Sequence, residues 1–243
     1  MALDRKIAYI DLSEGKIESR PIPVEIRKKY LGGRGLDAYL LYNHAPKGCD
    51  PLGPENPLLI SGGILTATCA SATARTHVMA KSPLTGLLGS ANMGGFFAPE
   101  MAWAGFHHLV IKGKAKNPVY IFIHNGEIKI LDAANVWGRT TTESQWAIRE
   151  ELGDEEIKSL VIGPAGEKRS LIAGVANDRG RMAARGGLGA VMGAKRLKAV
   201  VLVGARRIEP HDSEAIKALS RRCVEAIRFD PPFLNGMMMA YTG

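Results

Sequence analysis

Arginine and glycine residues are concentrated in one window of the chain, residues 165–210. The window holds eight glycines and three acidic residues, Glu167, Asp178 and Glu209. Its ten basic residues, which give it +7 of the chain's net charge of +8, are Lys168, Arg169, Arg179, Arg181, Arg185, Lys195, Arg196, Lys198, Arg206 and Arg207. Glycine lets backbone N–H groups approach a ligand closely, and arginine forms forked, charge-assisted hydrogen bonds with phosphate. The window therefore favours phosphate binding, and a solvated basic face is the alternative.

No other combination of residues predicts a familiar reaction centre. The chain lacks the G-x-x-x-x-G-K-[S/T] pattern of a P-loop, and Arg185-Gly-Gly-Leu-Gly-Ala matches a dinucleotide-binding glycine pattern only loosely. Ser82 and Ser90 lack the G-x-S-x-G context of a hydrolase nucleophile. The adjacent His107 and His108 would point to opposite faces of a strand, so they form a poor chelating pair, and we expect one of them to be buried and hydrogen-bonded.

The composition is that of an ordinary globular chain. Of the 243 residues, 46% are hydrophobic and 23% are charged, and the 28 glycines exceed the roughly 17 that average usage gives. No apolar run approaches the ~20 residues of a membrane helix, and the N-terminus lacks a signal-peptide core. Cys49, Cys69 and Cys223 are odd in number and widely spaced, which disfavours a disulfide framework or a zinc knuckle. We therefore expect a cytoplasmic protein without a membrane partner.

The positive charge also raises the question of a nucleic-acid partner. Aromatic residues make up only 6% of the chain and do not alternate with the basic residues of the window, so no stacking platform for bases is evident. We predict that the protein binds no nucleic acid, and that Lys195, Arg196, Arg206 and Arg207 are plain surface charge.

Short strands and helices are expected at irregular intervals. Alternating or short apolar runs predict strands over residues 6–12, 57–60, 76–80, 107–111, 119–124, 127–131, 159–162, 170–176 and 198–203. Helices are expected over residues 24–30, 36–42, 97–103, 141–152, 188–195 and 213–228. Glycines 32, 33 and 35 interrupt the first two helices, and residues 46–57 and 177–187 read as loops. This irregular order predicts an α+β fold rather than a doubly wound sheet, with no clean internal repeat.

Three local signals are stronger than the rest. Asn125-Gly126 between two strands predicts a type I′ hairpin, which needs two positive φ angles. Thr140 followed by Glu143 predicts a capping box. Asp212 can cap the last helix, whose apolar face would consist of Ile216, Leu219, Cys223 and Ile227, and we expect Cys223 to pack there.

Several motifs in a fixed order connect these features to a known family. They are Tyr30-Leu-Gly-Gly-Arg-Gly-Leu, Pro54-Glu-Asn-Pro-Leu, Lys81-Ser-Pro-Leu-Thr-Gly, Ala91-Asn-Met-Gly-Gly-Phe-Phe, Ala104-Gly-Phe, Ile162-Gly-Pro-Ala-Gly-Glu and Arg185-Gly-Gly-Leu-Gly-Ala-Val-Met-Gly. With these motifs the chain resembles the N-terminal domain of the tungsten-containing aldehyde ferredoxin oxidoreductase family over about residues 5–210. The resemblance implies two related β-sheets with flanking short helices. Together these form a base for tungstopterin, a bis-pyranopterin cofactor of tungsten or molybdenum.

The resemblance also implies which residues hold the cofactor. The residues that match the family's cofactor-binding segments are Arg75, Asn92, Gly94, Arg181, Met182, Ala184 and Arg185. The backbone carbonyls of Asn92 and Met182 would contact a magnesium ion between the two phosphates of the cofactor, whose four sulfurs can hold the metal without a protein ligand. Met182 stands where alanine is usual and Ala184 where glycine is usual, and a positive φ at Ala184 would be costly.

The family's later motifs are absent. The chain has no C-x-x-C-x-x-x-C motif for a [4Fe–4S] cluster and none of the acid–base residues of the substrate pocket. We therefore expect a tungstopterin-binding domain over residues 1–210 and the truncated start of a helical domain over residues 211–243, in a fragment or a split subunit. The expected partners are the C-terminal domains or a separate subunit, ferredoxin or another electron-transfer protein, and a second copy in a homo-oligomer.

The implied activity is oxidation of aldehydes to carboxylic acids with ferredoxin as acceptor. Two alternatives stay open: the active-site subunit of a tungsten benzoyl-CoA reductase, and a cofactor-binding module without activity. Lys81-Ser-Pro-Leu-Thr-Gly resembles the aldehyde branch, whereas Phe97-Ala-Pro-Glu is closer to the reductase branch.

Overall fold

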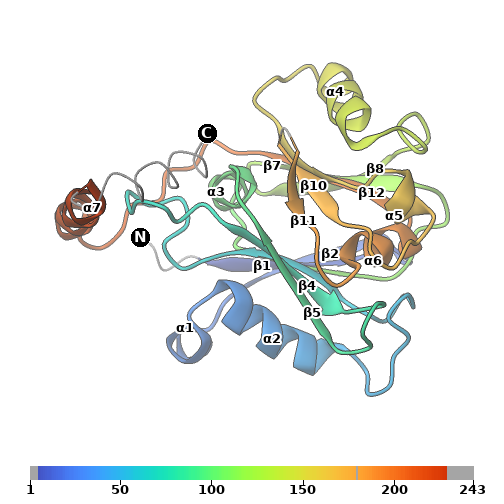
Figure 1. Cartoon of the computed structure of the whole chain (residues 1–243), viewed down its shortest axis with the longest axis horizontal. Helices are drawn as coiled ribbons and strands as arrows, with labels where there is room; N and C mark the ends of the chain where they lie inside the picture. The colour runs from blue at the N-terminus through green and yellow to red at the C-terminus, as the bar shows by residue number, and fades with distance from the viewer. Residues whose placement is uncertain (1–4, 179, 229–243) are drawn as a thin grey trace.

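Two six-stranded mixed β-sheets form the centre of the protein. The structure is a computed structural model that describes residues 5–178 and 180–228 (Figure 1). The first sheet consists of β1 (Lys6–Asp11), β2 (Lys16–Pro21), β3 (Leu58–Gly62), β4 (Thr76–Lys81), β5 (Leu88–Met93) and β6 (His108–Lys112). The second consists of β7 (Val119–His124), β8 (Glu127–Asp132), β9 (Lys158–Val161), β10 (Val175–Asn177), β11 (Arg181–Ala183) and β12 (Leu197–Val203). The helices are α1 (Val24–Tyr30), α2 (Gly33–His44), α3 (Phe97–Trp103), α4 (Thr141–Leu152), α5 (Pro164–Glu167), α6 (Leu188–Ala194) and α7 (Ser213–Arg228).

The two sheets have the same topology. The strand order of the first is β2-β1-β6-β3-β4-β5, and that of the second, read from its other end, is β8-β7-β12-β9-β10-β11. In each sheet one pair is parallel, β1 with β6 and β7 with β12, and the other pairs are antiparallel. Each strand of the first sheet therefore has a counterpart in the second, and the predicted α+β fold with two related sheets is confirmed.

The sheets pack against each other and are covered by helices on their outer faces. Along β1, Ala8 and Ile10 enter the core between the sheets, while Ile7 and Tyr9 face α2, as the two-residue period of a strand requires. Helix α2 covers the outer face of the first sheet, and α4 packs against β9 on the outer face of the second (Figure 1). The chain thus forms four layers, and α3 and α6 contribute side chains to the central core.

Two local predictions are confirmed in detail. Asn125 and Gly126 have φ values of 48° and 95°, both positive as a type I′ turn requires. Thr140 caps α4: its hydroxyl accepts from the Glu143 amide, and the Glu143 carboxylate accepts from the Thr140 amide at 2.9 Å. Helix α4 therefore begins where the sequence indicates.

The boundaries of several predicted helices and strands differ from those in the structure. The glycines before residue 36 do not interrupt the second helix, because α2 already begins at Gly33. The strand expected over residues 170–176 is reduced to Val175–Asn177, and the loop expected over 177–187 contains strand β11. Strand β5 was not predicted, and it exists because it pairs with β4 along its whole length. The repeat in strand topology was not predicted from the sequence pattern either.

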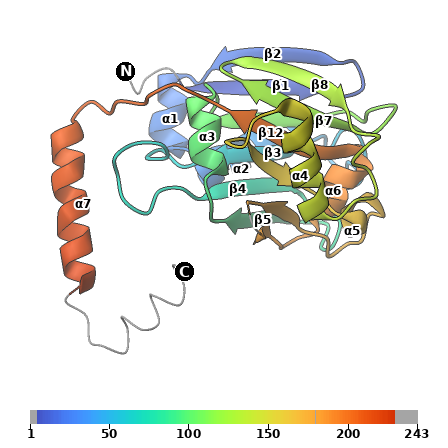
Figure 2. The same ribbon diagram turned by 90° about the horizontal axis from the view of Figure 1, so that it is seen from above.

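The last helix projects away from the two sheets (Figure 2). This helix forms hydrogen bonds with the 69–71 segment, where the Ser71 N–H donates to the Ser220 hydroxyl at 3.2 Å. Cys223 is exposed, so the expected packing of this cysteine is wrong, and the side chain of Ile227 lies outside the described residues. Residues 229–243 also lie outside them, and the predicted boundary at residue 210 stays a prediction.

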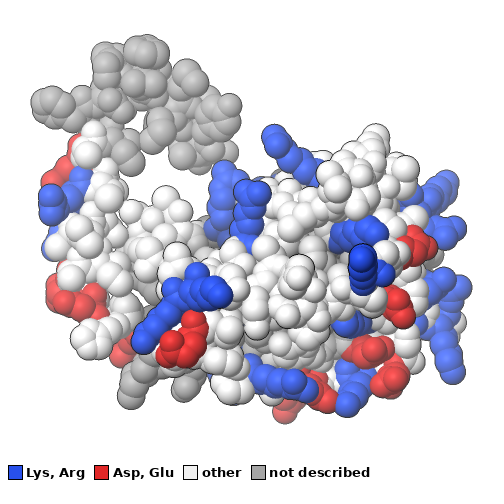
Figure 3. All heavy atoms as spheres, turned by 90° about the horizontal axis from the view of Figure 1, so that it is seen from below, with Lys and Arg blue, Asp and Glu red and all other residues white. Residues whose placement is uncertain are grey.

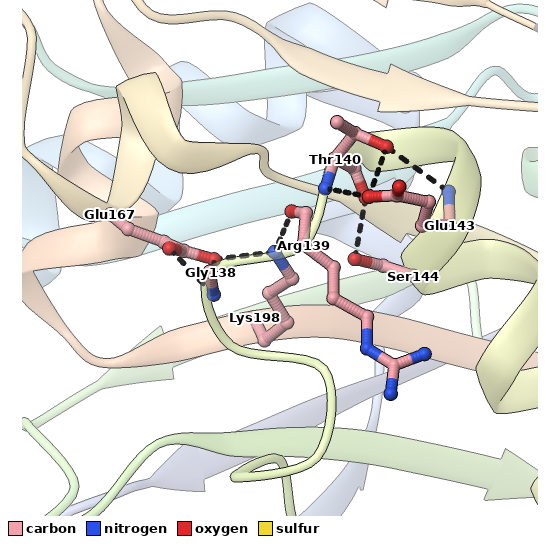
Figure 4. Close-up of polar contacts among 7 residues, drawn as sticks. All are labelled: Gly138, Arg139, Thr140, Glu143, Ser144, Glu167 and Lys198. Carbon is pink, nitrogen blue, oxygen red and sulfur yellow. Dashed lines mark hydrogen bonds and ion pairs between the residues drawn. The ribbon is translucent and has the colours of Figure 1, made fainter.

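Two lysines of the basic window are part of the interior. Lys195 is 1% exposed and donates to the carbonyls of Pro54 and Gly113 at 3.0 and 3.2 Å, so its assignment to the surface is wrong. Lys198 is fully buried, is paired with the Glu167 carboxylate and donates to the Arg139 carbonyl at 2.9 Å (Figure 4). A buried ammonium needs such partners because removal from water is costly. Arg196, Arg206 and Arg207 are exposed, as predicted.

A second buried polar cluster joins α2 to the first sheet. The carboxylate of Asp37, which is fully buried, accepts from Nδ1 of His77 at 2.6 Å, from Nδ1 of His108 at 2.9 Å and from the hydroxyl of Ser61. Burial raises the pKa of Asp37, but the hydrogen bonds from His108 and His77 outweigh it, so the pKa lies below its ordinary value. His108 is thus buried and hydrogen-bonded, as expected for one histidine of the pair.

His107 is buried as well. Its Nδ1 has no hydrogen-bond partner within the described part of the chain, and burial, followed by the charge of Arg5, lowers its pKa to about 3. This histidine is therefore neutral at physiological pH.

Candidate cofactor-binding site

The candidate site lies where the edge strands of the two sheets, β5 and β11, meet (Figure 1). At one end, a Cβ on Gly94 would lie 3.1 Å from Nη1 of Arg181, and at the other a Cβ on Gly186 would lie 3.3 Å from Cα of Gly89. These contacts place β5 beside residues 181–186, running in opposite directions. Edge strands leave some backbone N–H and C=O groups without a ladder partner, so main-chain groups are available here.

The structure brings the predicted residues together at this junction. Arg75 directly precedes β4, whose first residue, Thr76, pairs with Met93 of β5, the residue before Gly94. Asn92 lies in β5 and Met182 in β11, the counterpart strand of the second sheet. The members of the predicted set with exposed side chains are Arg75, Asn92, Arg181, Met182, Ala184 and Arg185.

Both departures from the family pattern fit the backbone. The end of the Met182 side chain lies over Gly174, 2.9 Å from the position that a Cβ would take there, and Met182 is 44% exposed. Ala184 is not among the described non-glycine residues with positive φ, so the strain considered for alanine at this position is absent. Neither side chain forces the main chain into an unusual conformation.

The arginines at the junction differ from the buried lysines of the same window. Within the described residues, the guanidinium groups of Arg75, Arg181 and Arg185 form no ion pair or hydrogen bond, whereas Lys195 and Lys198 bond to main-chain carbonyls. Free guanidinium groups beside exposed main chain can bind phosphate in a forked geometry. On the face shown in Figure 3, basic side chains are interspersed with acidic and uncharged ones.

Two further residues of the junction were missed. The Asn177 amide donates to the Gly94 carbonyl at 2.9 Å, and the Phe96 N–H donates to Oδ2 of Asp178 at 3.0 Å. An Asn-Asp pair after a short strand is an ordinary turn signal, so the sequence pattern alone did not distinguish these residues.

Comparison with known proteins identifies relatives of this chain. Residues 7–204 match the family described as aldehyde ferredoxin oxidoreductase, N-terminal domain. The tungsten-containing aldehyde ferredoxin oxidoreductase of Pyrococcus furiosus is 43% identical over 228 residues, and that of Thermococcus kodakarensis is 40% identical. The aliphatic sulfonate oxidoreductase, WOR-like subunit, of Pyrococcus furiosus is 35% identical over 237 residues.

A solved structure has the same fold. The active site complex BamBC of benzoyl coenzyme A reductase, in complex with 1,5 dienoyl-CoA, superposes with a TM-score of 0.91 at 35% identity and covers 93% of this chain. This chain spans only 35% of the chain in that structure and 38% of the length of the aldehyde ferredoxin oxidoreductases that it matches. The matches to the Pyrococcus furiosus and Thermococcus kodakarensis proteins cover 94% of this chain. Among residues 5–178 and 180–228, no helix combines the length and apolar character needed to cross a membrane.

Proposed function

Because the chain belongs to the aldehyde ferredoxin oxidoreductase family, through its N-terminal domain, we propose that it holds the phosphate–magnesium part of a tungstopterin cofactor. The observation that carries the proposal is the junction of β5 and β11, where the guanidinium groups of Arg75, Arg181 and Arg185 have no partner among the residues that the structure describes. The whole enzyme would oxidise aldehydes to carboxylic acids and pass the electrons to ferredoxin.

The residues present fit the cofactor chemically. Arg75, Arg181 and Arg185 would bind its phosphates, and the main-chain carbonyls of Asn92 and Met182 would supply the oxygen ligands that magnesium prefers. When bound, the cofactor supplies the two-electron redox chemistry at its tungsten or molybdenum. Asn92 and Met182 lie on counterpart strands of the two related sheets, which suits a ligand with two like halves.

The remaining functions of the enzyme would lie outside this chain. The [4Fe–4S] cluster and the acid–base residues of the substrate pocket would come from C-terminal domains or from a separate subunit. This agrees with the 38% of its relatives' length that the chain spans. The enzyme would be cytoplasmic and homo-oligomeric, and the domain over residues 1–210 would end before the helix that projects from the sheets.

One alternative has a specific observation in its favour. The likeness to the BamBC complex, at a TM-score of 0.91, is compatible with an active-site subunit of a tungsten benzoyl-CoA reductase. Assays of the assembled enzyme with aldehydes and with aromatic acyl-CoA esters would separate the two activities, since each predicts turnover of one substrate class.

Replacing Arg185 with alanine should reduce cofactor content more than it reduces stability. Its exposed guanidinium has no partner within the described chain, so its loss leaves the fold intact and removes a charge-assisted contact with phosphate. We expect about tenfold weaker cofactor retention, measured as tungsten or molybdenum per protein. Arg207→Ala, at another exposed arginine of the same window, is the matched control. Equal metal content in Arg185→Ala and wild type would contradict the assignment.

The 243-residue chain alone should not turn over aldehydes. The acid–base residues of the substrate pocket would lie in the part of the enzyme beyond the 38% of its relatives' length that this chain spans. An assay of the purified chain with a dye acceptor is expected to show no aldehyde-dependent reduction. Measurable turnover would show that the pocket residues lie in this chain.

A further inference from the structure

Asn177 and Asp178 join the two sheets at the candidate site. The Asn177 amide reaches the Gly94 carbonyl, and Oδ2 of Asp178 accepts from the Phe96 N–H. Strands β5 and β11 are edges of different sheets, so no backbone ladder joins them. These two contacts, which we call the inter-sheet clamp, connect the segment after β5 to the β10–β11 turn.

The clamp is closely packed. A Cβ on Gly95 would lie 2.8 Å from Oδ1 of Asn177 and 3.0 Å from Oδ2 of Asp178, and Gly95 has a φ of 98°. Asn177 is fully buried. Only glycine therefore lets the two segments approach this closely, and the Asn177 side chain cannot exchange its bond for one with water.

The clamp also contains features that cost free energy. Within residues 5–178 and 180–228, Oδ1 of Asn177 and Oδ1 of Asp178 are buried without a hydrogen-bond partner, and Asp178 has a φ of 27°, which is unusual for a residue with a side chain. Strained backbone and unsatisfied polar atoms tend to gather where function requires a particular geometry. Here they coincide with the junction that contains Asn92, Met182 and the free arginines.

We propose that Asn177 and Asp178 are positioning residues that set the distance between Asn92 on β5 and Met182 on β11. They thereby set how firmly the phosphates and magnesium of the cofactor are held. This proposal rests on the proposed function, since it assumes that the two carbonyls act on one ion. The clamp acts through Gly94 and Phe96 on one side and through the pairing of Asn177 with Arg181, at the start of β11, on the other.

The first test compares two buried asparagines in the holoenzyme. Asn177→Leu keeps a side chain of similar size but removes the donor to Gly94. Asn56→Leu is the matched control, because Asn56 is also fully buried and donates to the carbonyls of Pro51 and Lys81 at 2.7 and 3.0 Å, within the first sheet. The readouts are tungsten, molybdenum and pterin per folded protein, together with the unfolding temperature. We expect about tenfold weaker cofactor retention in Asn177→Leu and wild-type content in folded Asn56→Leu, although both lower the unfolding temperature.

The second test uses Asp178, whose partly exposed side chain makes loss of folding less of a concern. Asp178→Ala removes the acceptor for the Phe96 N–H and should lose cofactor, whereas Asp178→Asn keeps an oxygen acceptor and should restore its retention. The proposal is overturned if Asn177→Leu and Asp178→Ala retain as much metal per folded protein as Asn56→Leu. A wild-type holoenzyme without tungsten or molybdenum would instead overturn the proposed function, and the positioning role with it.

Discussion

Replacing Asp37 with alanine is expected to lower the free energy of unfolding by about 3–5 kcal/mol. The carboxylate is fully buried and accepts three hydrogen bonds, from His77, His108 and Ser61, which lie on β4, β6 and β3. Its removal leaves all three donors buried without a partner and detaches α2 from the sheet that it covers. Urea unfolding of wild type and variant at pH 7 measures the difference.

Two controls separate the causes. Asp37→Asn keeps the shape and one acceptor, so we expect a smaller loss than for alanine. Asp50→Ala removes an exposed aspartate that accepts from the Leu52 amide at 2.9 Å, and its effect should be about 1 kcal/mol. If Asp37→Ala lowered the free energy of unfolding by less than Asp50→Ala does, the buried cluster would contribute no net stability.

The effect of Asp37 also depends on pH. Its pKa lies below the unfolded value of 3.8, because hydrogen bonds from His108 and His77 outweigh the effect of burial. Its charged form therefore stabilises the fold fully above about pH 4, and this contribution is lost as the pH falls through the folded pKa. The difference in the free energy of unfolding between wild type and Asp37→Ala should accordingly become smaller in acid.

The sequence predicted best those elements whose signals are local. The Asn125-Gly126 turn and the Thr140–Glu143 cap are each determined by residues within four positions, and the structure has both. The ordered glycine and arginine motifs predicted the family, which the match over residues 7–204 confirms, while the site residues that they indicate stay a prediction. Such signals do not depend on what the rest of the chain does.

Strands β5 and β11 show why other elements could not be predicted. β5 contains glycine, serine and asparagine, which have low strand propensity, and β11 is a three-residue strand in an arginine- and glycine-rich segment. Both are strands because a neighbour, β4 or β10, supplies the hydrogen-bond ladder. The candidate site lies on these two strands, so its geometry depends on long-range pairing that no local pattern encodes.

The internal repeat was hidden for a related reason. The two sheets share their topology, but each half of the chain has a different buried polar cluster. The cluster in the first half consists of Asp37, His77 and His108, and the one in the second half consists of Glu167 and Lys198. The similar glycine runs at Gly32 and Gly186 precede α2 and α6, which occupy different places in the two halves. The two halves share strand order and pairing directions while these residues differ.

The burial of Lys195 is expected to have a second large effect: the free energy of unfolding should rise with pH. Burial, with a smaller contribution from Lys112, lowers the pKa of its ammonium from 10.5 to about 7, and the charges of Asp11 and Cys49 oppose this shift. Below pH 7 both the folded and the unfolded chain hold the proton, so the full cost of burying the charge is present. Between pH 7 and 10.5 unfolding takes up a proton, so stability increases as the pH rises.

The size of this effect follows from the shift in pKa. At about 1.4 kcal/mol per pH unit, wild type should gain on the order of 4 kcal/mol relative to Lys195→Met between pH 6.5 and 10.5. Urea unfolding of both proteins across this range tests it, and Lys114→Met, at an exposed lysine, is the control with no such gain. If the difference in the free energy of unfolding between wild type and Lys195→Met were the same at every pH in this range, Lys195 would keep its proton in the folded state. The carbonyls of Pro54 and Gly113 would then stabilise the buried ammonium, rather than hold a neutral amine.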